Sequence, residues 1–204
     1  MNDRAIDFEK GNGLVPVIVQ DADTGRVLMM GYMNREALNR TRETRMVTFF
    51  SRSRRKLWTK GETSGNYLEL IDLAIDCDGD TLLAKARPHG PTCHTGNESC
   101  FDLEPGRGWQ SLPEAVGGLT RVIADRKDAM PEASYTADLI RRGVDRMARG
   151  VGEEALEVML AAKSGEQEAL VQEVADLFYH TMVLLAGLGV TPDRVALELS
   201  RRKK

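Results

Sequence analysis

The chain has 204 residues, of which 42% are hydrophobic and 29% charged, and its net charge at neutral pH is −3. This composition is typical of a soluble globular protein and excludes a disordered chain or a broadly basic nucleic-acid-binding surface. The longest apolar run, residues 182–190, is far shorter than the ~20 residues that a membrane span requires, and three cysteines do not form a disulfide framework. We therefore expect a cytoplasmic protein without membrane segments.

The first half of the chain carries the signals of β-strands. Apolar runs rich in β-branched residues predict five strands, over residues 14–21, 26–33, 46–51, 66–76 and 81–88. Asn34, with Glu36 in the turn that follows, predicts the capped start of a short helix over 35–43. We expect a mainly β domain of the α+β class over residues 1–108.

The second half changes to the spacing of helices. Ser111 and Glu114 match a capping box and predict a helix that reaches about residue 130. A further helix should run from Ser134 or Thr136 to about 148 and break at the glycines of 150–152. The remaining helices are predicted over 153–163, over 168–189 and after Thr191-Pro192. We expect an all-α bundle over 109–204, with the boundary in the glycine-rich segment 104–110.

A strongly basic block lies in the first half. Residues 40–60 hold eight lysines and arginines against one acidic residue, Glu43. A solvated edge strand and loop is one interpretation, and a phosphate-binding patch is the other. The sequence Gly-Glu-Thr-Ser-Gly-Asn at 61–66 favours the patch, because small residues let backbone N–H groups approach an anion closely.

Cysteines and aspartates form a candidate metal-binding set. On an extended strand, Asp76, Asp78 and Asp80 would share one face and Cys77 would point to the other. Carboxylate oxygens suit Mg²⁺, whereas thiolates suit Zn²⁺. Cys93 and Cys100 add two thiols at a spacing unlike that of zinc fingers, which favours an open catalytic zinc site over a closed structural one. Buried thiols without a metal are the alternative.

The helical half contains its own carboxylates. Residues three apart on a helix lie about 60° apart, so each of two predicted helices presents an acidic pair. Two such faces opposite one another would form a cage whose repulsion divalent cations relieve, whereas solvated acidic stripes are the alternative. The carboxylates concerned are Glu153, Glu154 and Glu157 in the first helix, and Glu173 and Asp176 in the second.

These motifs resemble two enzyme families of histidine biosynthesis. Four segments together resemble phosphoribosyl-AMP cyclohydrolases: SRSR (51–54), LWTKGETSGN (57–66), DCDGD (76–80) and CHTGNESCF (93–101). Three later segments resemble phosphoribosyl-ATP pyrophosphatases, an all-α family with the layout of MazG-type nucleotide pyrophosphatases: SYTADL (134–139), GVGEEALEV (150–158) and EVADLFYH (173–180). The resemblance covers nearly the whole chain, in the domain order of the bifunctional fusion.

For the second half, the resemblance implies hydrolysis of phosphoribosyl-ATP to phosphoribosyl-AMP and pyrophosphate. Glu153 would orient or deprotonate the attacking water. This chain has Gly150 where the family usually has a lysine, so Arg149 would take over a phosphate contact. The implied Mg²⁺ ligands are Glu154, Glu157, Glu173 and Asp176.

For the first half, the resemblance implies zinc-dependent hydrolytic opening of the adenine ring of phosphoribosyl-AMP. His94 would transfer protons, since imidazole titrates near neutrality. Cys77, Cys93 and Cys100 would bind Zn²⁺, and Asp76, Asp78 and Asp80 would bind Mg²⁺. The implied phosphate-binding residues are Arg52, Arg54, Lys60, Glu62, Thr63, Ser64, Gly65 and Asn66.

The opposite directions of Cys77 and its neighbouring aspartates on a strand suggest a homodimer. Cys77 of one chain would then complete the zinc site of the other, as the resemblance to dimeric cyclohydrolases with shared sites also implies. The expected partners are nucleotide substrates and a second copy of the chain, with neither nucleic acid nor membrane. Two alternatives are a house-cleaning nucleotide pyrophosphatase with a degenerate zinc-binding N-terminal domain and a non-catalytic zinc-stabilised binding module.

Overall fold

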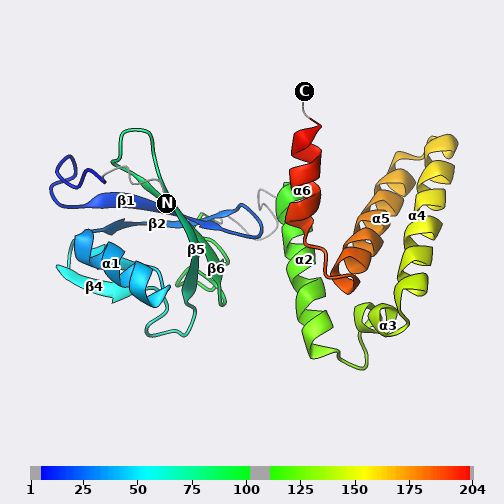
Figure 1. The fold of residues 1–204 in the computed structure, drawn as a ribbon, viewed down its shortest axis with the longest axis horizontal. Helices are drawn as coiled ribbons and strands as arrows, with labels where there is room; N and C mark the ends of the chain where they lie inside the picture. The colour runs from blue at the N-terminus through cyan, green and yellow to red at the C-terminus, as the bar shows by residue number, and fades with distance from the viewer. Residues whose placement is uncertain (1–5, 102–110, 203–204) are drawn as a thin grey trace. The chain divides into compact units, whose positions relative to one another are not determined.

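The computed structural model describes residues 6–101 and 111–202, and the chain divides into two compact units, Met1–Glu114 and Ala115–Lys204 (Figure 1). The expected fold classes are confirmed, since a mainly β unit with one helix is followed by a helical unit. The predicted boundary segment, 104–110, lies wholly outside the described residues, so the division at 108/109 stays a prediction.

A four-stranded sheet forms the centre of the first unit, with the strand order β2-β1-β6-β5. The central strands β1 and β6 are parallel, and each pairs with an antiparallel edge strand. Alternate side chains of β1 (Val15, Val17 and Val19) are fully buried, as the two-residue period of a strand requires. The strands are β1 (Val15–Asp21), β2 (Val27–Met33), β5 (Leu68–Ile75) and β6 (Leu82–Pro88).

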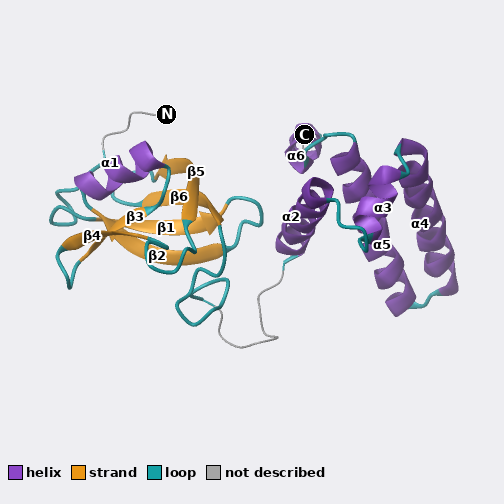
Figure 2. Cartoon of the chain, turned by 90° about the horizontal axis from the view of Figure 1, so that it is seen from below, coloured by secondary structure: helices purple, strands orange, loops and turns teal. Residues whose placement is uncertain are grey.

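Helix α1 (Arg35–Thr44) and a separate hairpin complete this unit. As predicted, Asn34 caps α1, because its side-chain oxygen accepts the N–H of Ala37 at 2.8 Å. The helix contacts β2 and β3 (Thr48–Ser51), and β3 pairs antiparallel with β4 (Lys56–Thr59) (Figure 2). The sequence did not predict β4, since its four residues follow a run of charged residues that resembles a loop.

The hairpin is fastened to the sheet by aromatic packing. Phe49 is fully buried, and its ring centroid lies 5.0 Å from that of Trp58 on the paired strand. Gly31 of β2 lies directly against the Phe49 ring, because a Cβ at position 31 would be 2.6 Å from Cε1 and still nearer to Cδ1. The absence of a side chain at position 31 therefore allows the hairpin to pack on β2.

The second unit contains five helices in its described residues. Ser111 and Glu114 form the predicted capping box, in which each side chain accepts the other residue's N–H. Ser134 caps α3 as predicted. The helices are α2 (Leu112–Ala129), α3 (Tyr135–Arg141), α4 (Val144–Ser164), α5 (Gln167–Gly187) and α6 (Pro192–Arg201).

The predicted helix break at residues 150–152 is wrong. Helix α4 runs unbroken through Gly150 and Gly152, and the chain turns earlier, at Gly143, which has a φ of +84°. Gly150 is buried against His180 of α5. A glycine that serves close packing inside a helix has the same sequence signature as one that ends a helix, which explains the error.

Helix α5 is long and strongly apolar, although little of it is buried. It is the one helix of the described residues that is long and apolar enough to cross a membrane, and 11% of that stretch is buried. Length and composition alone are weak evidence for a membrane-spanning helix. Glu173, Asp176 and His180 place polar side chains within this apolar stretch, and such groups are costly in hydrocarbon.

We predict that Gly31→Ala destabilises the first unit by about 1–3 kcal/mol, the usual cost of overpacking a well-filled core. Denaturant unfolding followed by tryptophan fluorescence measures the change. Phe49→Leu in the same chain removes the ring that the new methyl group meets, so the double variant should lose less than the sum of the single changes. An unchanged unfolding midpoint for Gly31→Ala would contradict this packing account.

Candidate active sites

The loop after β6 holds two of the three cysteines in a fixed arrangement. At its far end, the Ser99 hydroxyl donates to the carbonyl of Val27 at 2.8 Å, and the Cys100 N–H donates to the carbonyl of Leu28 at 2.8 Å. These two bonds attach the loop to β2. At its near end, the Cys93 N–H donates to the carbonyl of Asn97 at 2.9 Å and closes a tight turn.

The surroundings of Cys93 favour its thiolate form. The Thr95 hydroxyl donates to Cys93 Sγ at 3.1 Å and, with the Thr95 backbone, lowers the pKa of this thiol. Cys100 also acts on it through a hydrogen bond that lowers the same pKa. The thiolate is the form that binds metal ions, so the loop prepares Cys93 as a ligand.

Of the two histidines near this loop, His94 is the one that lies beside Cys93. Its Nδ1 lies 3.8 Å from Cys93 Sγ, and its side chain is exposed. His89 Nε2 instead lies 3.1 Å from a carboxylate oxygen of Glu69. The structure therefore places His94 beside the cysteines and gives His89 a different partner.

Lys60 connects the cysteines to the predicted phosphate-binding loop. Burial lowers its pKa, and the charges of Cys100 and Cys93 act in the opposite direction, so the ammonium lies within electrostatic reach of both thiols. Lys60 Nζ also donates to the carbonyl of Asn66 at 3.1 Å. The segment 61–66 is a turn whose Thr63 and Ser64 side chains are exposed.

Two of the predicted phosphate-binding residues already have other contacts. Glu62 accepts the N–H of Thr59 at 3.0 Å and so stabilises the turn. The Arg52 guanidinium lies 3.9 Å from the centroid of the Tyr32 ring, in a cation–π contact that holds it over β2. Arg54 is exposed at the turn between β3 and β4.

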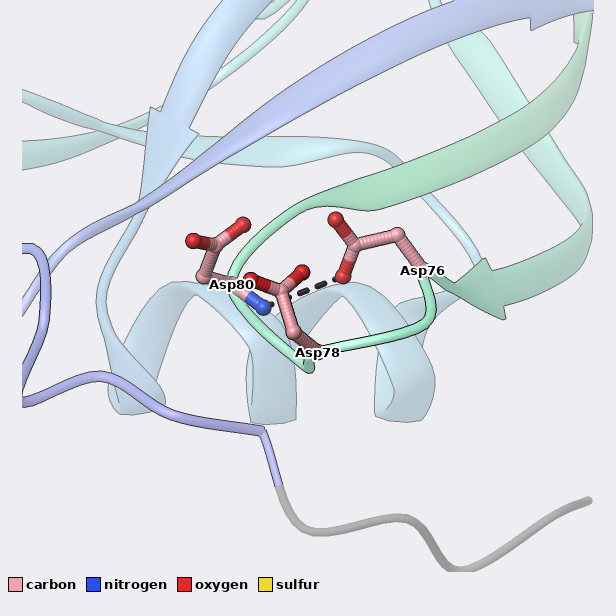
Figure 3. Close-up of side chains that lie close together, drawn as sticks. All are labelled: Asp76, Asp78 and Asp80. Carbon is pink, nitrogen blue, oxygen red and sulfur yellow. Dashed lines mark hydrogen bonds between the residues drawn. The ribbon is translucent and has the colours of Figure 1, made fainter.

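The three aspartates come together, but not on a strand as expected. Strand β5 ends at Ile75, and residues 76–80 form a loop (Figure 3). Asp76 Oδ1 accepts the N–H groups of Gly79, Asp80 and Thr81 at 3.0, 3.0 and 3.2 Å. These bonds curl the loop, so that carboxylate oxygens of all three aspartates lie within 4.8 Å of one another.

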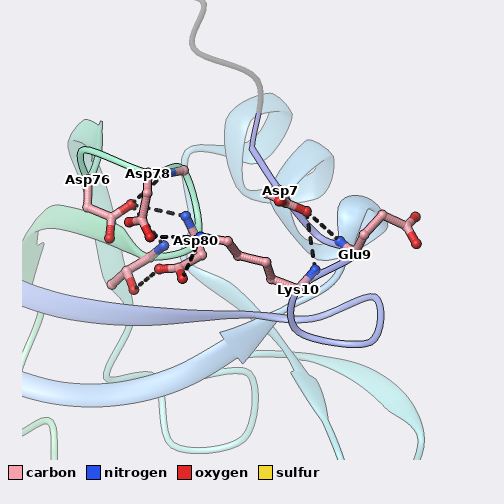
Figure 4. A network of polar contacts seen from close by, with 8 residues as sticks. Asp7, Glu9, Lys10, Asp76, Asp78 and Asp80 are labelled. Carbon is pink, nitrogen blue, oxygen red and sulfur yellow. Dashed lines mark hydrogen bonds and ion pairs between the residues drawn. The ribbon is translucent and has the colours of Figure 1, made fainter.

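Lys10 already supplies a positive charge to this aspartate loop (Figure 4). Its Nζ lies 2.7 Å from Asp78 Oδ2 and 3.4 Å from Asp80 Oδ2. The hydrogen bond raises the pKa of Lys10 and lowers that of Asp78. No sequence pattern indicated this lysine, which lies 68 residues before Asp78.

One chain does not bring its three cysteines together as metal ligands. All three lie in the described residues, and none forms a disulfide. The described ranges contain two convergent groups of potential metal ligands, and neither group includes a cysteine. Cys77 lies on the aspartate loop, whereas Cys93 and Cys100 lie on the loop after β6.

The second convergent group lies between α4 and α5. Single carboxylate oxygens of Glu154, Glu173 and Asp176 approach within 4.8 Å of one another. Burial raises the pKa of Glu173, and the charges of Glu157, Glu154 and Asp176 raise it further. The charges of the other three predicted ligands therefore all act on the Glu173 carboxyl.

Three predicted residues of the helical half lie outside this group: Glu157, Glu153 and Arg149. Glu153 Oε2 forms an ion pair with Arg146 Nη1 at 3.2 Å, and the Glu153 side chain is half exposed. Arg149 is exposed, whereas Gly150 beside it is buried. The structure therefore brings together three of the four predicted metal ligands, but neither the predicted base nor the arginine.

Sequence reasoning missed His180, which is 6% exposed beside the carboxylates. Its Nε2 lies 3.5 Å from Glu154 Oε1, and its Nδ1 has no hydrogen-bond partner in the described part of the chain. The spacing could have revealed it, because His180 lies four residues after Asp176 and seven after Glu173, on the same face of α5.

A β unit with thiol and aspartate clusters, followed by a helical unit with a carboxylate cage, defines a two-domain hydrolase of the metal-dependent type. Residues 29–102 match the family model of phosphoribosyl-AMP cyclohydrolase, and residues 116–203 match that of phosphoribosyl-ATP pyrophosphohydrolase.

Similar proteins contain both units in the same order. The histidine biosynthesis bifunctional protein HisIE of Photobacterium profundum is 53% identical over 199 residues, which cover 97% of this chain and 96% of that protein. The HisIE proteins of Vibrio cholerae and Xanthomonas campestris are each 52% identical, over 98% of this chain and 94% of their own length. The chain belongs to this family of bifunctional enzymes.

We predict that Glu173→Gln raises the melting temperature of the metal-free protein. The raised pKa means that the folded state binds this proton more tightly than the unfolded chain, so stability falls as the carboxyl ionises with rising pH. Removing the charge relieves that repulsion at neutral pH. Thermal unfolding in a chelator, followed by far-ultraviolet circular dichroism, measures the effect.

Glu168→Gln is the matched control for this prediction. Glu168 lies in the first turn of the same helix, where a negative charge is favourable, so its neutralisation should lower the melting temperature slightly. Added Mg²⁺ should stabilise the wild type more than Glu173→Gln. A variant Glu173→Gln that melts below the wild type in chelator would contradict the repulsion among these carboxylates.

Proposed function

We propose that this chain performs two consecutive hydrolyses of histidine biosynthesis, one in each unit. The helical unit hydrolyses phosphoribosyl-ATP to phosphoribosyl-AMP and pyrophosphate, and the first unit then opens the adenine ring of phosphoribosyl-AMP. The observation that carries the proposal is the convergence of Glu154, Glu173 and Asp176 in a unit that follows a cyclohydrolase domain.

In the helical unit, several carboxylates lie where the polyphosphate of the substrate would bind. Mg²⁺, when bound by Glu154, Glu157, Glu173 and Asp176, neutralises phosphate charge and acidifies a water molecule. Glu153 is the proposed base, and its ion pair with Arg146 fixes the carboxylate on α4. Arg149 is exposed on the same helix and is the proposed phosphate contact.

In the first unit, cationic groups and thiols surround the proposed substrate position. Lys60, Arg52 and Arg54, with the turn of residues 62–66, would bind the two monophosphates of phosphoribosyl-AMP. His94 would move a proton during ring opening, since its imidazole lies beside Cys93. Mg²⁺ would bind at the aspartate loop, in place of the Lys10 ammonium.

The thiol chemistry fits zinc, but one chain supplies an incomplete set. The lowered pKa of Cys93 and its hydrogen bond with Cys100 fit the donor set that zinc prefers. Zn²⁺, when bound by Cys93, Cys100 and Cys77 of a second chain, supplies a Lewis acid for ring hydrolysis. The failure of the three cysteines to converge within one chain supports a shared site in a homodimer.

The helical unit also supports a homodimer. Large apolar side chains on α4 and α5 remain more than a third exposed, which is costly unless another surface covers them. A second copy would cover them without requiring a membrane. The side chains are Leu156, Met159, Leu160, Val171 and Phe178. Three cysteines without disulfides fit the reducing cytoplasm that we propose as its location.

We predict that the two activities can be removed separately. Cys93→Ala should abolish ring opening and leave pyrophosphate release near the wild-type rate, because the two sites lie on different units. Glu154→Gln should do the reverse and leave added phosphoribosyl-AMP fully convertible. Assays with purified protein, phosphoribosyl-ATP, Mg²⁺ and Zn²⁺ would follow pyrophosphate and ring opening in parallel. Near wild-type ring opening by Cys93→Ala would rule out the zinc assignment.

We further predict that two inactive chains restore one another. A mixture of Cys77→Ala and Cys93→Ala chains should regain partial ring opening after subunit exchange, since each mixed dimer contains one intact set of three cysteines. Each variant alone, exchanged with itself, is the control. No recovery after exchange has been verified by mass spectrometry would mean that each zinc site is built within one chain.

A further inference from the structure

The imidazole of His180 occupies a fitted slot between α4 and α5. Its ring lies nearly perpendicular to two tyrosine rings, with centroid distances of 5.2 Å to Tyr179 and 6.2 Å to Tyr135. The Tyr179 hydroxyl is held by the hydroxyl of Thr136 at 2.8 Å. Gly150 closes the slot on the side of α4.

The slot directs one nitrogen of the ring at a proposed metal ligand. Gly150 and Glu154 lie four residues apart and therefore on one face of α4, about one turn from each other. The ring spans this turn, with Nδ1 over Gly150 and Nε2 at 3.5 Å from Glu154 Oε1. Both side chains are largely buried, so water screens their interaction little.

We propose that His180 is a positioning residue, which holds the Glu154 carboxylate in place for a divalent cation, and that Gly150 provides the space this ring needs. The inference rests on the proposed function, because it takes Glu154 as a metal ligand. A carboxylate that a neighbour already orients loses less conformational freedom when it binds a cation, and partners of this kind typically change metal affinity about 10–100-fold.

The cost of a glycine inside a helix supports this role for Gly150. Alanine is the better helix former, so a glycine in the interior of α4 weakens the helix unless its lack of a side chain is used. A Cβ at position 150 would lie 2.9 Å from Cε1 of the His180 ring and nearer still to Nδ1. Any larger residue would therefore move the ring away from its place beside Glu154.

The test measures binding of Mn²⁺, a spectroscopic probe for the Mg²⁺ site, to the full-length metal-free protein. The binding component that Glu154→Gln removes defines the site of the helical unit. His180→Ala should weaken that component about tenfold. His180→Gln places an amide N–H near the position of Nε2 and should restore most of the affinity. Pyrophosphate release should show the same order at subsaturating Mg²⁺ and converge at high Mg²⁺.

A double-variant cycle tests the pairing of Gly150 with His180. Gly150→Ala alone should also weaken the Mn²⁺ component about tenfold, but should add nothing in the His180→Ala background. Gly152→Ala is the matched control, because a Cβ there meets nothing within 4 Å, and it should bind Mn²⁺ as the wild type does. Circular dichroism of each variant verifies that the helices form.

The possible results separate this inference from the proposed function. If Glu154→Gln binds Mn²⁺ and releases pyrophosphate like the wild type, the proposed function fails and the inference fails with it. If Glu154→Gln removes both but His180→Ala and Gly150→Ala bind Mn²⁺ normally, only the role of His180 is overturned. Additive losses in the double variant would likewise overturn the pairing with Gly150.

Discussion

The carboxylates that converge between α4 and α5 repel one another, and the packing of the helical unit has to outweigh this repulsion. Burial and three neighbouring charges raise the pKa of Glu173, so ionisation of this carboxyl disfavours the folded chain. The interior of the unit offsets this with a small core around Ile123, Met147 and Val183 and with the packed slot of His180. A divalent cation bound among these carboxylates would reduce their mutual repulsion.

In the first unit, backbone hydrogen bonds and the Lys10 ammonium offset the repulsion among the clustered carboxylates. Asp76 accepts three backbone N–H groups, and these bonds shape the aspartate loop. Two hydrogen bonds to β2 hold the end of the loop that follows β6. The sheet therefore positions both clusters through rigid connections at strand ends. Cys77 and Cys93 nevertheless lie on different loops, and this separation is what the proposed shared zinc site would have to overcome.

The sequence predicted what depends on local patterns. The caps at Asn34, Ser111 and Ser134 follow from side chains that bond to nearby N–H groups, and the fold classes follow from hydrophobic spacing. The helix break predicted at Gly150 was wrong because the side chain that packs against this glycine, His180, lies on another helix. Lys10 was missed for the same cause: a contact across 68 residues leaves no local trace.

The pair of Lys10 with Asp78 makes the segment before β1 part of the aspartate site. Both side chains are about half exposed, and an ion pair so close to water contributes little free energy. The ammonium is therefore a weakly held partner of these carboxylates. A chain trimmed to begin at β1 would present the same three aspartates without that partner, and its apparent metal preference would describe a different site.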